Sequence, residues 1–141
     1  GDTIAAAALT KMCNDSHNQT YVRYEMLVNK FARQRNRASR YELKTYFGQL
    51  QKIIVVHIPP TPLLCLTDPT TAIFAVIKPC EIESHNSLGN SYYSKLGSII
   101  VMDITCLQCI VGRIPVGTQW ALIDRSGNLA RVIYDESDVE Q

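Results

Sequence analysis

The sequence predicts a mainly β (α+β) domain, a small antiparallel β-barrel with N-terminal helices packed on it. Three observations lead to this prediction. Between Ile99 and Tyr134, short apolar segments alternate with turn residues, which is typical of an antiparallel β-meander. Two further β-rich segments precede this stretch, and helical spacing occurs mainly before residue 34. Closing roughly five or six short strands into a barrel removes the exposed edges that an open sheet would leave.

Composition and charge narrow the possible functions. The chain has 141 residues, 46% hydrophobic and 19% charged, which indicates one globular domain. Because the formal net charge is only +1, nucleic-acid binding would have to depend on a local patch. No apolar run approaches the roughly 18 residues that span a membrane. Five cysteines, an odd number spread through apolar segments, indicate reduced thiols in an intracellular protein. Since the chain begins with Gly1 rather than Met, we expect it to be part of a longer protein.

The N-terminal segment, residues 1–46, is predicted to be helical. Residues 3–13 contain a run of alanines, the residue with the highest helix propensity. Residues 20–33 are expected to form an amphipathic helix, because large apolar side chains recur there at helical spacing. The side chains concerned are Tyr21, Tyr24, Val28 and Phe31.

The most basic stretch of the sequence follows the second expected helix. Six cations and one acid, Glu42, give it a local charge of +5. The cations are Lys30, Arg33, Arg35, Arg37, Arg40 and Lys44. Asn36 and Ser39 indicate a loop in its middle. These cations could follow a phosphate backbone, with Tyr41, Tyr46 and Phe47 stacking or packing beside them. The alternative is a solvated helix end, where the helix dipole favours arginine.

Residues 47–134 are predicted to form the barrel, and residues 135–141 a frayed acidic tail. Gly48 indicates either a close backbone approach or a bulge. The β-branched segment Leu50–Ile58 predicts a buried strand, and the prolines at 59–62 predict an extended loop. The remaining expected elements are a strand at Thr71–Ile77 ended by Pro79, a loop at Glu83–Ser91, a helical turn at Tyr92–Gly97, one long strand through Ile100–Ile110, and strands at Trp120–Ile123 and Ala130–Tyr134.

Cys106-Leu-Gln-Cys109 is the segment most similar to a metal or redox motif. A zinc site requires two more ligands at matching spacing, and His57 is only a weak candidate. Because side chains at i and i+3 of a strand point to opposite faces, buried structural cysteines are the favoured interpretation. An enzyme that uses either thiol with His57 is an open alternative. Asp103 and Asp124 could together bind a divalent metal, but capping and turn roles are favoured. No catalytic residue and no cofactor are predicted.

Four segments together resemble a known group of proteins: FGQLQKIIVVHI, AVIKPCEI, SYYSKLGSIIVMDITCLQCIVGRI and QWALIDRSGNLAR. They resemble a segment of basidiomycete proteins encoded by transposable elements. More loosely, they are similar to the C-terminal β-domain of fungal transposases of the Kyakuja–Dileera–Zisupton and CACTA-like classes. The matching residues are Phe47-Gly48, Val101–Ile104 and Trp120–Asp124, within a resemblance covering about residues 20–134. The resemblance implies an accessory nuclear domain, similar to a bromo-adjacent-homology (BAH) or SH3-like barrel, outside the nuclease core.

Our first hypothesis is therefore a non-catalytic nucleic-acid or chromatin-associated module of a transposon-derived protein, in which the six cations contact phosphate. The alternative is a protein-interaction or oligomerisation domain without nucleic-acid binding. In that case exposed β-edges and the proline loop at residues 58–66 would bind a partner or a second copy.

Overall fold

The computed structural model describes residues 4, 6, 7 and 19–124. They form a mainly β, antiparallel fold, as predicted, in one eight-stranded sheet. Along the chain the strands are β1 (Tyr21–Asn29), β2 (Tyr41–Ile58), β3 (Thr70–His85), β4 (Ser91–Leu96), β5 (Ile100–Asp103), β6 (Leu107–Ile110), β7 (Gly112–Val116) and β8 (Gln119–Ile123). Two 3-10 turns, η1 (Pro62–Leu64) and η2 (Ile104–Cys106), complete the described elements.

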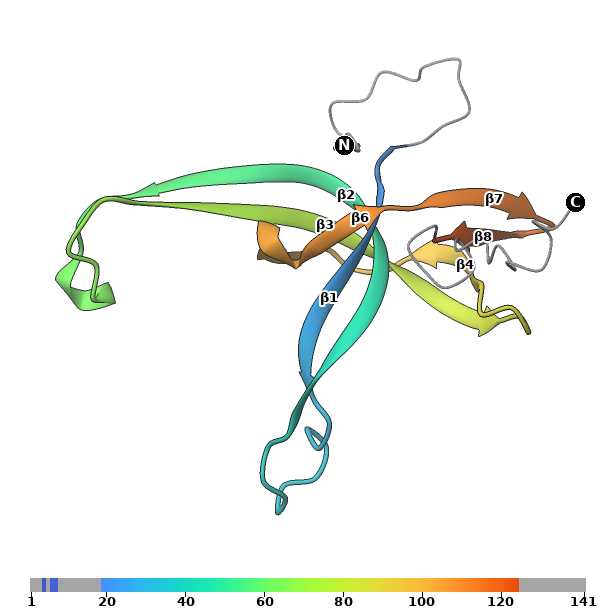
Figure 1. Cartoon of the computed structure of the whole chain (residues 1–141), viewed down its shortest axis with the longest axis horizontal. Helices are drawn as coiled ribbons and strands as arrows, with labels where there is room; N and C mark the ends of the chain where they lie inside the picture. Colours follow the sequence, from blue (N-terminus) through green and yellow to red (C-terminus); the bar gives the residue numbers. More distant parts are fainter. Residues whose placement is uncertain (1–3, 5, 8–18, 125–141) are drawn as a thin grey trace, which may run out of the picture.

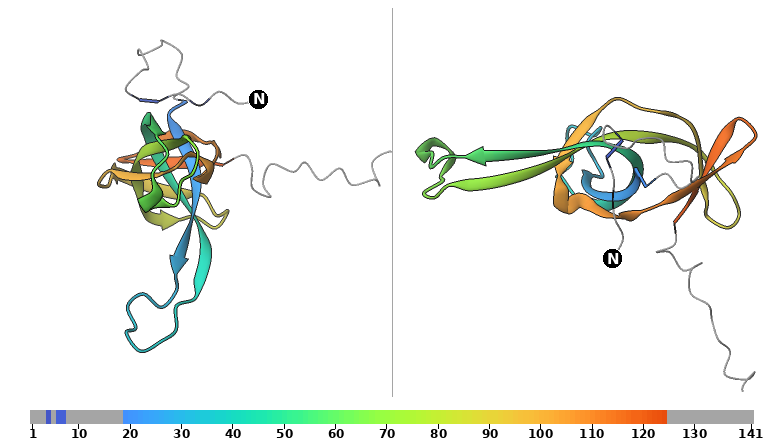
Figure 2. Two further views of the ribbon diagram at one scale, coloured as in Figure 1. Left: turned by 90° about the vertical axis from the view of Figure 1, so that its left-hand side faces the viewer. Right: turned by 90° about the horizontal axis from the view of Figure 1, so that it is seen from above.

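The sheet curls into a half-barrel. Its strand order is β6-β1-β2-β3-β4-β8-β7, with β5 paired to β3. β6 and β7 lie at opposite ends of this order, yet only Val111 separates them along the chain. The Val111 amide donates to the Tyr21 carbonyl oxygen at 2.9 Å. The sheet must therefore bend until its two ends meet at this residue, as the end-on view shows (Figure 2).

Two apolar clusters fill the half-barrel. The first lies among β1, β2, β3 and β5, and its buried members are Ala6, Val22, Tyr24, Leu50, Ala75, Ile77 and Met102. The second lies towards β4, β7 and β8, and its buried members are Tyr21, Cys80, Tyr93, Val111 and Leu122. Trp120 packs against the second cluster and is half-buried. Burying these side chains is the main favourable term for the fold.

Two hairpin arms project from the half-barrel, because β2 and β3 are 18 and 16 residues long. β1 pairs with the first half of β2, up to Tyr21↔Gln49, and this hairpin ends in the loop at residues 30–40. We call it the basic arm. The second half of β2 pairs with the first half of β3 and ends in residues 59–69, and we call this hairpin the apolar arm. The two arms leave the half-barrel in different directions (Figure 1).

The predicted helix at residues 20–33 is wrong, because this segment contains β1. Its large side chains divide between the two clusters: Val22 and Tyr24 enter the first, and Tyr21 enters the second. Val22, Tyr24 and the half-buried Met26 therefore follow the period of two that a strand requires. The tyrosines and valines that recur at helical spacing are also residues that favour strands. Pairing with β2 decides between the two periods.

The other expected N-terminal helix, residues 3–13, lies mostly outside the described residues. Ile4, Ala6 and Ala7 are described, and none of them is helical. Ala6 is buried in the first cluster, and the Ala7 amide donates to the Leu50 carbonyl oxygen at 2.8 Å. The expected strand at Ala130–Tyr134 and the acidic tail at residues 135–141 also lie outside the described residues. The boundary expected between residues 46 and 47 falls within β2.

Over the described residues, the predicted β-meander is wrong apart from the β7–β8 hairpin. β5 pairs with β3 and β6 pairs with β1, so the expected long strand is split between two distant partners. Asp103 makes the split possible, because its side chain caps η2 by accepting the Thr105 amide at 2.9 Å. The expected helical turn after Ser91 is the strand β4. β3 does not end at Pro79 but continues to His85, into the segment expected to be a loop.

The strand expected at Leu50–Ile58 exists, but it is not buried as predicted. Leu50 is fully buried, whereas Ile53, Ile54, Val55 and Val56 are exposed on the apolar arm. An apolar run predicts burial only where another layer covers it, and no described segment covers this part of β2.

Candidate nucleic-acid interface

Asn29, the last residue of β1, closes the loop at residues 30–40. Its side-chain Oδ1 accepts the backbone amides of Phe31 at 3.1 Å and Arg40 at 3.2 Å. The Lys30 amide also donates to the Arg40 carbonyl oxygen at 2.7 Å. Asparagine commonly binds nearby backbone amides in this way at turns. Asn29 therefore fixes both ends of the loop at the tip of the basic arm (Figure 1).

Five of the six predicted cations lie on this loop. They are Lys30, Arg33, Arg35, Arg37 and Arg40, and all five are exposed. The loop itself contains no acidic residue. Among the described residues, none of these five cations has a carboxylate within ion-pair distance. Uncompensated like charges concentrated on one projecting loop create a local positive potential that attracts anions.

Arg37 makes two side-chain contacts within the loop. Its guanidinium carbon lies 3.9 Å from the centre of the Phe31 ring, and Nη1 donates to Gln34 Oε1 at 3.4 Å. Two backbone bonds, from Gln34 to Phe31 and from Arg37 to Gln34, fold this part of the loop into consecutive turns. The contact with the ring holds the cation at the surface without neutralising it.

Lys44, the sixth predicted cation, lies apart from the loop. It is on β2 opposite Met26, and its Nζ is 3.5 Å from Glu42 Oε1. Both side chains are largely exposed, so the ion pair contributes little stability. The neighbouring acid nevertheless reduces the local positive charge. Lys44 is therefore a weaker phosphate-binding candidate than the loop residues.

Of the three aromatic residues expected to accompany the cations, only Tyr41 is exposed. Tyr46 stacks on Tyr24, with ring centres 5.6 Å apart, so it supports the first cluster. Phe47 is half-buried and packs against the second cluster. The basic arm thus offers one ring, at the base of the loop, for contact with a nucleic-acid base.

Three other cations, Arg23, Lys95 and Arg113, are engaged by the protein itself. Arg23 Nη1 lies 3.1 Å from Asp124 Oδ2, and Lys95 Nζ lies 3.3 Å from Glu81 Oε2. The Arg113 guanidinium lies between the rings of Tyr21 and Trp120. Lys52 and Lys78 make no ion pair among the described residues, but they lie singly on β2 and β3, whereas five cations lie together on the loop of the basic arm.

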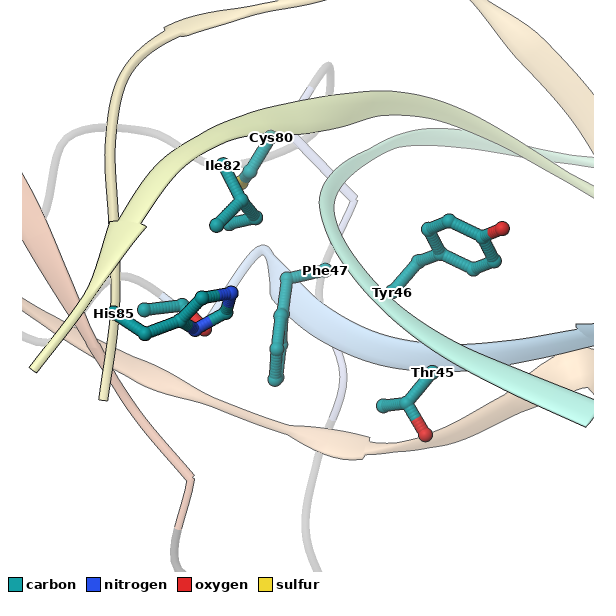
Figure 3. A pocket seen from close by; sticks show the side chains of 7 residues that line it. Thr45, Tyr46, Phe47, Cys80, Ile82 and His85 are labelled. Atoms are coloured by element: carbon teal, nitrogen blue, oxygen red, sulfur yellow. The ribbon is translucent and has the colours of Figure 1, made fainter. Parts of the chain in front are cut away.

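A pocket of about 340 Å³ lies where β2 and β3 part (Figure 3). Cys80, Ile82 and His85 of β3 line one side of it, with Phe47 of β2 opposite them. His85 Nδ1 is 3.1 Å from the hydroxyl of Ser91. Burial raises the pKa of the Cys80 thiol to about 12, which keeps it protonated and poorly nucleophilic at neutral pH. The lining contains no Lys, Arg, Asp or Glu side chain, so phosphate has no strong partner there.

The structure does not bring the candidate metal and thiol residues together. Cys106 ends η2, Cys109 lies on β6, and His57 lies on the apolar arm with Nδ1 3.2 Å from Thr71 Oγ1. Asp103 is occupied by its cap on η2, and Thr105 holds the pKa of this carboxyl below its usual value. Within residues 4, 6, 7 and 19–124, no group of three or more His, Cys, Asp or Glu side chains could hold a metal ion.

Two features of the described structure were not predicted from the sequence. The first is the role of Asn29, which an asparagine directly before a basic loop could have indicated. The second is the apolar arm, because the apolar run Ile53–Val56 predicts a buried strand, whereas the structure exposes it.

No helix of the described residues is long and apolar enough to cross a membrane. Comparisons with protein-family models, curated proteins and solved structures found no match.

Proposed function

We propose that this chain is a nucleic-acid-binding module whose basic arm contacts the phosphate backbone. The observation that supports this most directly is the set of five exposed, uncompensated cations on the Asn29-closed loop. Phosphate contacts of this kind supply affinity and orientation but carry no sequence information. The interaction is therefore expected to be strongly salt-dependent and weakly sequence-selective.

The shape of the basic arm suits a duplex better than a single strand. A two-stranded β-ribbon fits the major groove of B-DNA, which is about 12 Å wide. Single-strand binders instead rely on several exposed rings that stack on successive bases. Here Phe31 is covered by Arg37, and Tyr46 is stacked on Tyr24. We therefore propose duplex DNA as the ligand class, with Tyr41 as an accessory contact.

The biological setting belongs to the same proposal. The resemblance over about residues 20–134 supports an accessory, non-catalytic role in a transposon-derived fungal protein that acts in the nucleus or on chromatin. It also supports a relationship to BAH- or SH3-like barrels.

Charge reversal with a matched control tests the proposal. The loop variant carries Arg33→Glu, Arg35→Glu and Arg40→Glu. The control variant carries Lys52→Glu, Lys78→Glu and Lys95→Glu, which changes the net charge equally but lies outside the loop. Fluorescence anisotropy with a labelled 20-base-pair duplex at about 50 mM salt should show at least about tenfold weaker binding for the loop variant.

The control variant should bind within about threefold of the wild type, because only a long-range charge has changed. Equal losses in both variants would show that net charge, rather than the loop, determines binding. No binding by the wild type at low salt would overturn the proposal in favour of a protein-interaction domain without nucleic-acid binding.

A further inference from the structure

The apolar arm has one strand edge that pairs with nothing among the described residues. β1 covers the outer edge of β2 only as far as Gln49, and Ala7 covers the Leu50 carbonyl. A register shift between Leu50 and Lys52 follows, and from there β2 pairs only with β3. The outer edge of residues 52–58 therefore presents its backbone amides and carbonyls to the outside. Such an edge is a template for pairing with another strand.

Folded proteins usually protect edges of this kind with charges, prolines, bulges or very short strands. Here Lys52 and Pro59 lie only at the two ends of the segment, and the residues between them are apolar apart from His57. The same four residues, Ile53–Val56, are exposed on both faces of the arm. Nothing in the edge itself prevents a second strand from adding to it.

The apolar arm exposes several large apolar side chains. Four residues of β2, Ile73 of β3, and Leu63 and Leu64 at the tip are each between 37% and 94% exposed. Exposed apolar side chains gathered on one projecting element are typical of a surface that binds a partner. Ile99 and Val101, both exposed, extend the apolar surface beside β3 at the base of the arm.

The charge distribution indicates a second copy of the chain as the partner. If two β2 edges pair antiparallel about an axis at Val55, Ile54 lies opposite Val56 and Ile53 opposite His57. Lys52 then lies opposite Ile58, at opposite ends of the joined strands, so no like charges meet. A charged peptide or nucleic acid would find a single complementary cation, Lys52, at one end of this edge. A second copy supplies the same apolar side chains and the same free edge.

We propose that this protein forms a two-fold homodimer by antiparallel pairing of the outer edges of β2 at residues 52–58. The two apolar arms would then form one four-stranded sheet. Because the basic arm leaves the half-barrel in a different direction, both basic loops stay uncovered in the dimer (Figure 1). This interface does not depend on nucleic-acid binding, but a dimer with two loops gains avidity for a duplex long enough to reach both.

Analytical ultracentrifugation of the full 141-residue chain tests the proposal first. The wild type should be mainly dimeric at about 100 µM and dissociate on dilution. Val55→Lys, which places two cations at the axis, should raise the dimer dissociation constant at least about tenfold. Val116→Lys is the matched control, because Val116 is also a strand valine and its 46% exposure is close to the 53% of Val55. The control should change the constant less than about twofold.

Disulfide formation provides a second measurement that does not rely on weakening the dimer. Single cysteines at positions 53, 54, 55 and 56 are placed in a Cys65→Ser background. This background removes the thiol at the arm tip, which is the exposed one among the described cysteines. Opposed residues in antiparallel strands have Cα atoms about 4.5–5.5 Å apart, within the range that a disulfide spans. One position at the two-fold axis should therefore cross-link much faster than the others, and faster than Val116→Cys.

A monomeric wild type at about 100 µM would overturn the proposal. A dimer equally weakened by Val55→Lys and Val116→Lys, or equal cross-linking at all positions, would also overturn it. The two proposals fail separately. The loop variant should still dimerise, and Val55→Lys should still bind a short duplex.

Discussion

Gly48 of β2 lies directly opposite Pro79 of β3, at the last pair before the two strands part. Beyond this pair β2 turns towards β1, and β3 turns towards β4. A Cβ atom on Gly48 would lie 2.5 Å from Ile77 Cγ2 and 2.8 Å from the Lys78 carbonyl oxygen. Glycine is thus required by the close approach of the two backbones, one of the two roles expected for it. The two arms diverge from this close approach of β2 and β3.

Gly48→Ala should destabilise the fold through this steric clash. We expect the free energy of unfolding to fall by about 1–3 kcal/mol, the usual cost of forcing extra atoms into a packed site. Chemical denaturation followed by the fluorescence of Trp120, the single tryptophan, provides the measurement. Gly112→Ala is the control, because its nearest contact would be Ile123 Cβ at 3.7 Å, an ordinary distance. If both variants have the same free energy of unfolding, the close approach of β2 and β3 does not require glycine at position 48.

Arg113 should stabilise the second cluster in a way that lysine cannot reproduce. Its guanidinium carbon lies 4.2 Å from the Tyr21 ring centre and 3.8 Å from that of Trp120, and Nη1 donates to the Tyr93 hydroxyl at 3.0 Å. A planar group can stack between two rings and keep this bond, whereas an ammonium cannot. Arg113→Lys should therefore lower the free energy of unfolding by about 1–2 kcal/mol and alter the Trp120 emission.

The control for Arg113 is Arg35→Lys, on the exposed loop, where the same exchange should leave both stability and emission unchanged. If Arg113→Lys unfolds at the same denaturant concentration as the wild type, the stacked arrangement contributes nothing to stability.

Stability should decrease in alkaline solution. Burial raises the pKa of Cys80 from an ordinary value of 9.0 to about 12, and that of Tyr24 from 10.0 to about 12. Between these values the unfolded chain binds fewer protons than the folded chain, so raising the pH favours unfolding. The contribution of these two groups to the free energy of unfolding is fully present below about pH 9 and is lost as the pH rises towards 12.

Tyr24→Phe removes one of these two titrations. Its free energy of unfolding should decrease less steeply than that of the wild type between about pH 10 and 11, the upper part of the measurable range. Urea denaturation at a series of pH values tests this. If the free energy of unfolding falls equally steeply with pH in the wild type and in Tyr24→Phe, the titration of Tyr24 does not contribute to the alkaline loss of stability.

The sequence allowed the β class and the basic loop to be predicted, because both depend on local residues. β-branched segments indicate the middle of β2 and the first half of β3 as strands, and Asn36 and Ser39 indicate the loop. The strand β1 was mistaken for a helix because its tyrosines and valines fit both periods, and only pairing with β2 distinguishes them. The exposure of Ile53–Val56 could not be predicted from local residues. It depends on whether another part of the fold packs over the arm, and no described segment does. The pairing of β5 with β3 and of β6 with β1 was not predicted, because these strands are far apart in the sequence.

The salt dependence of duplex binding tests the phosphate-contact proposal most directly. If all five loop cations contact phosphate, a plot of log Kd against log salt concentration should have a slope of about 4 to 5 for the wild type. The variant with Arg33, Arg35 and Arg40 changed to Glu should have a slope smaller by about 2 to 3. A wild-type slope near zero, or an unchanged slope in this variant, would contradict the assignment of phosphate binding to the basic arm.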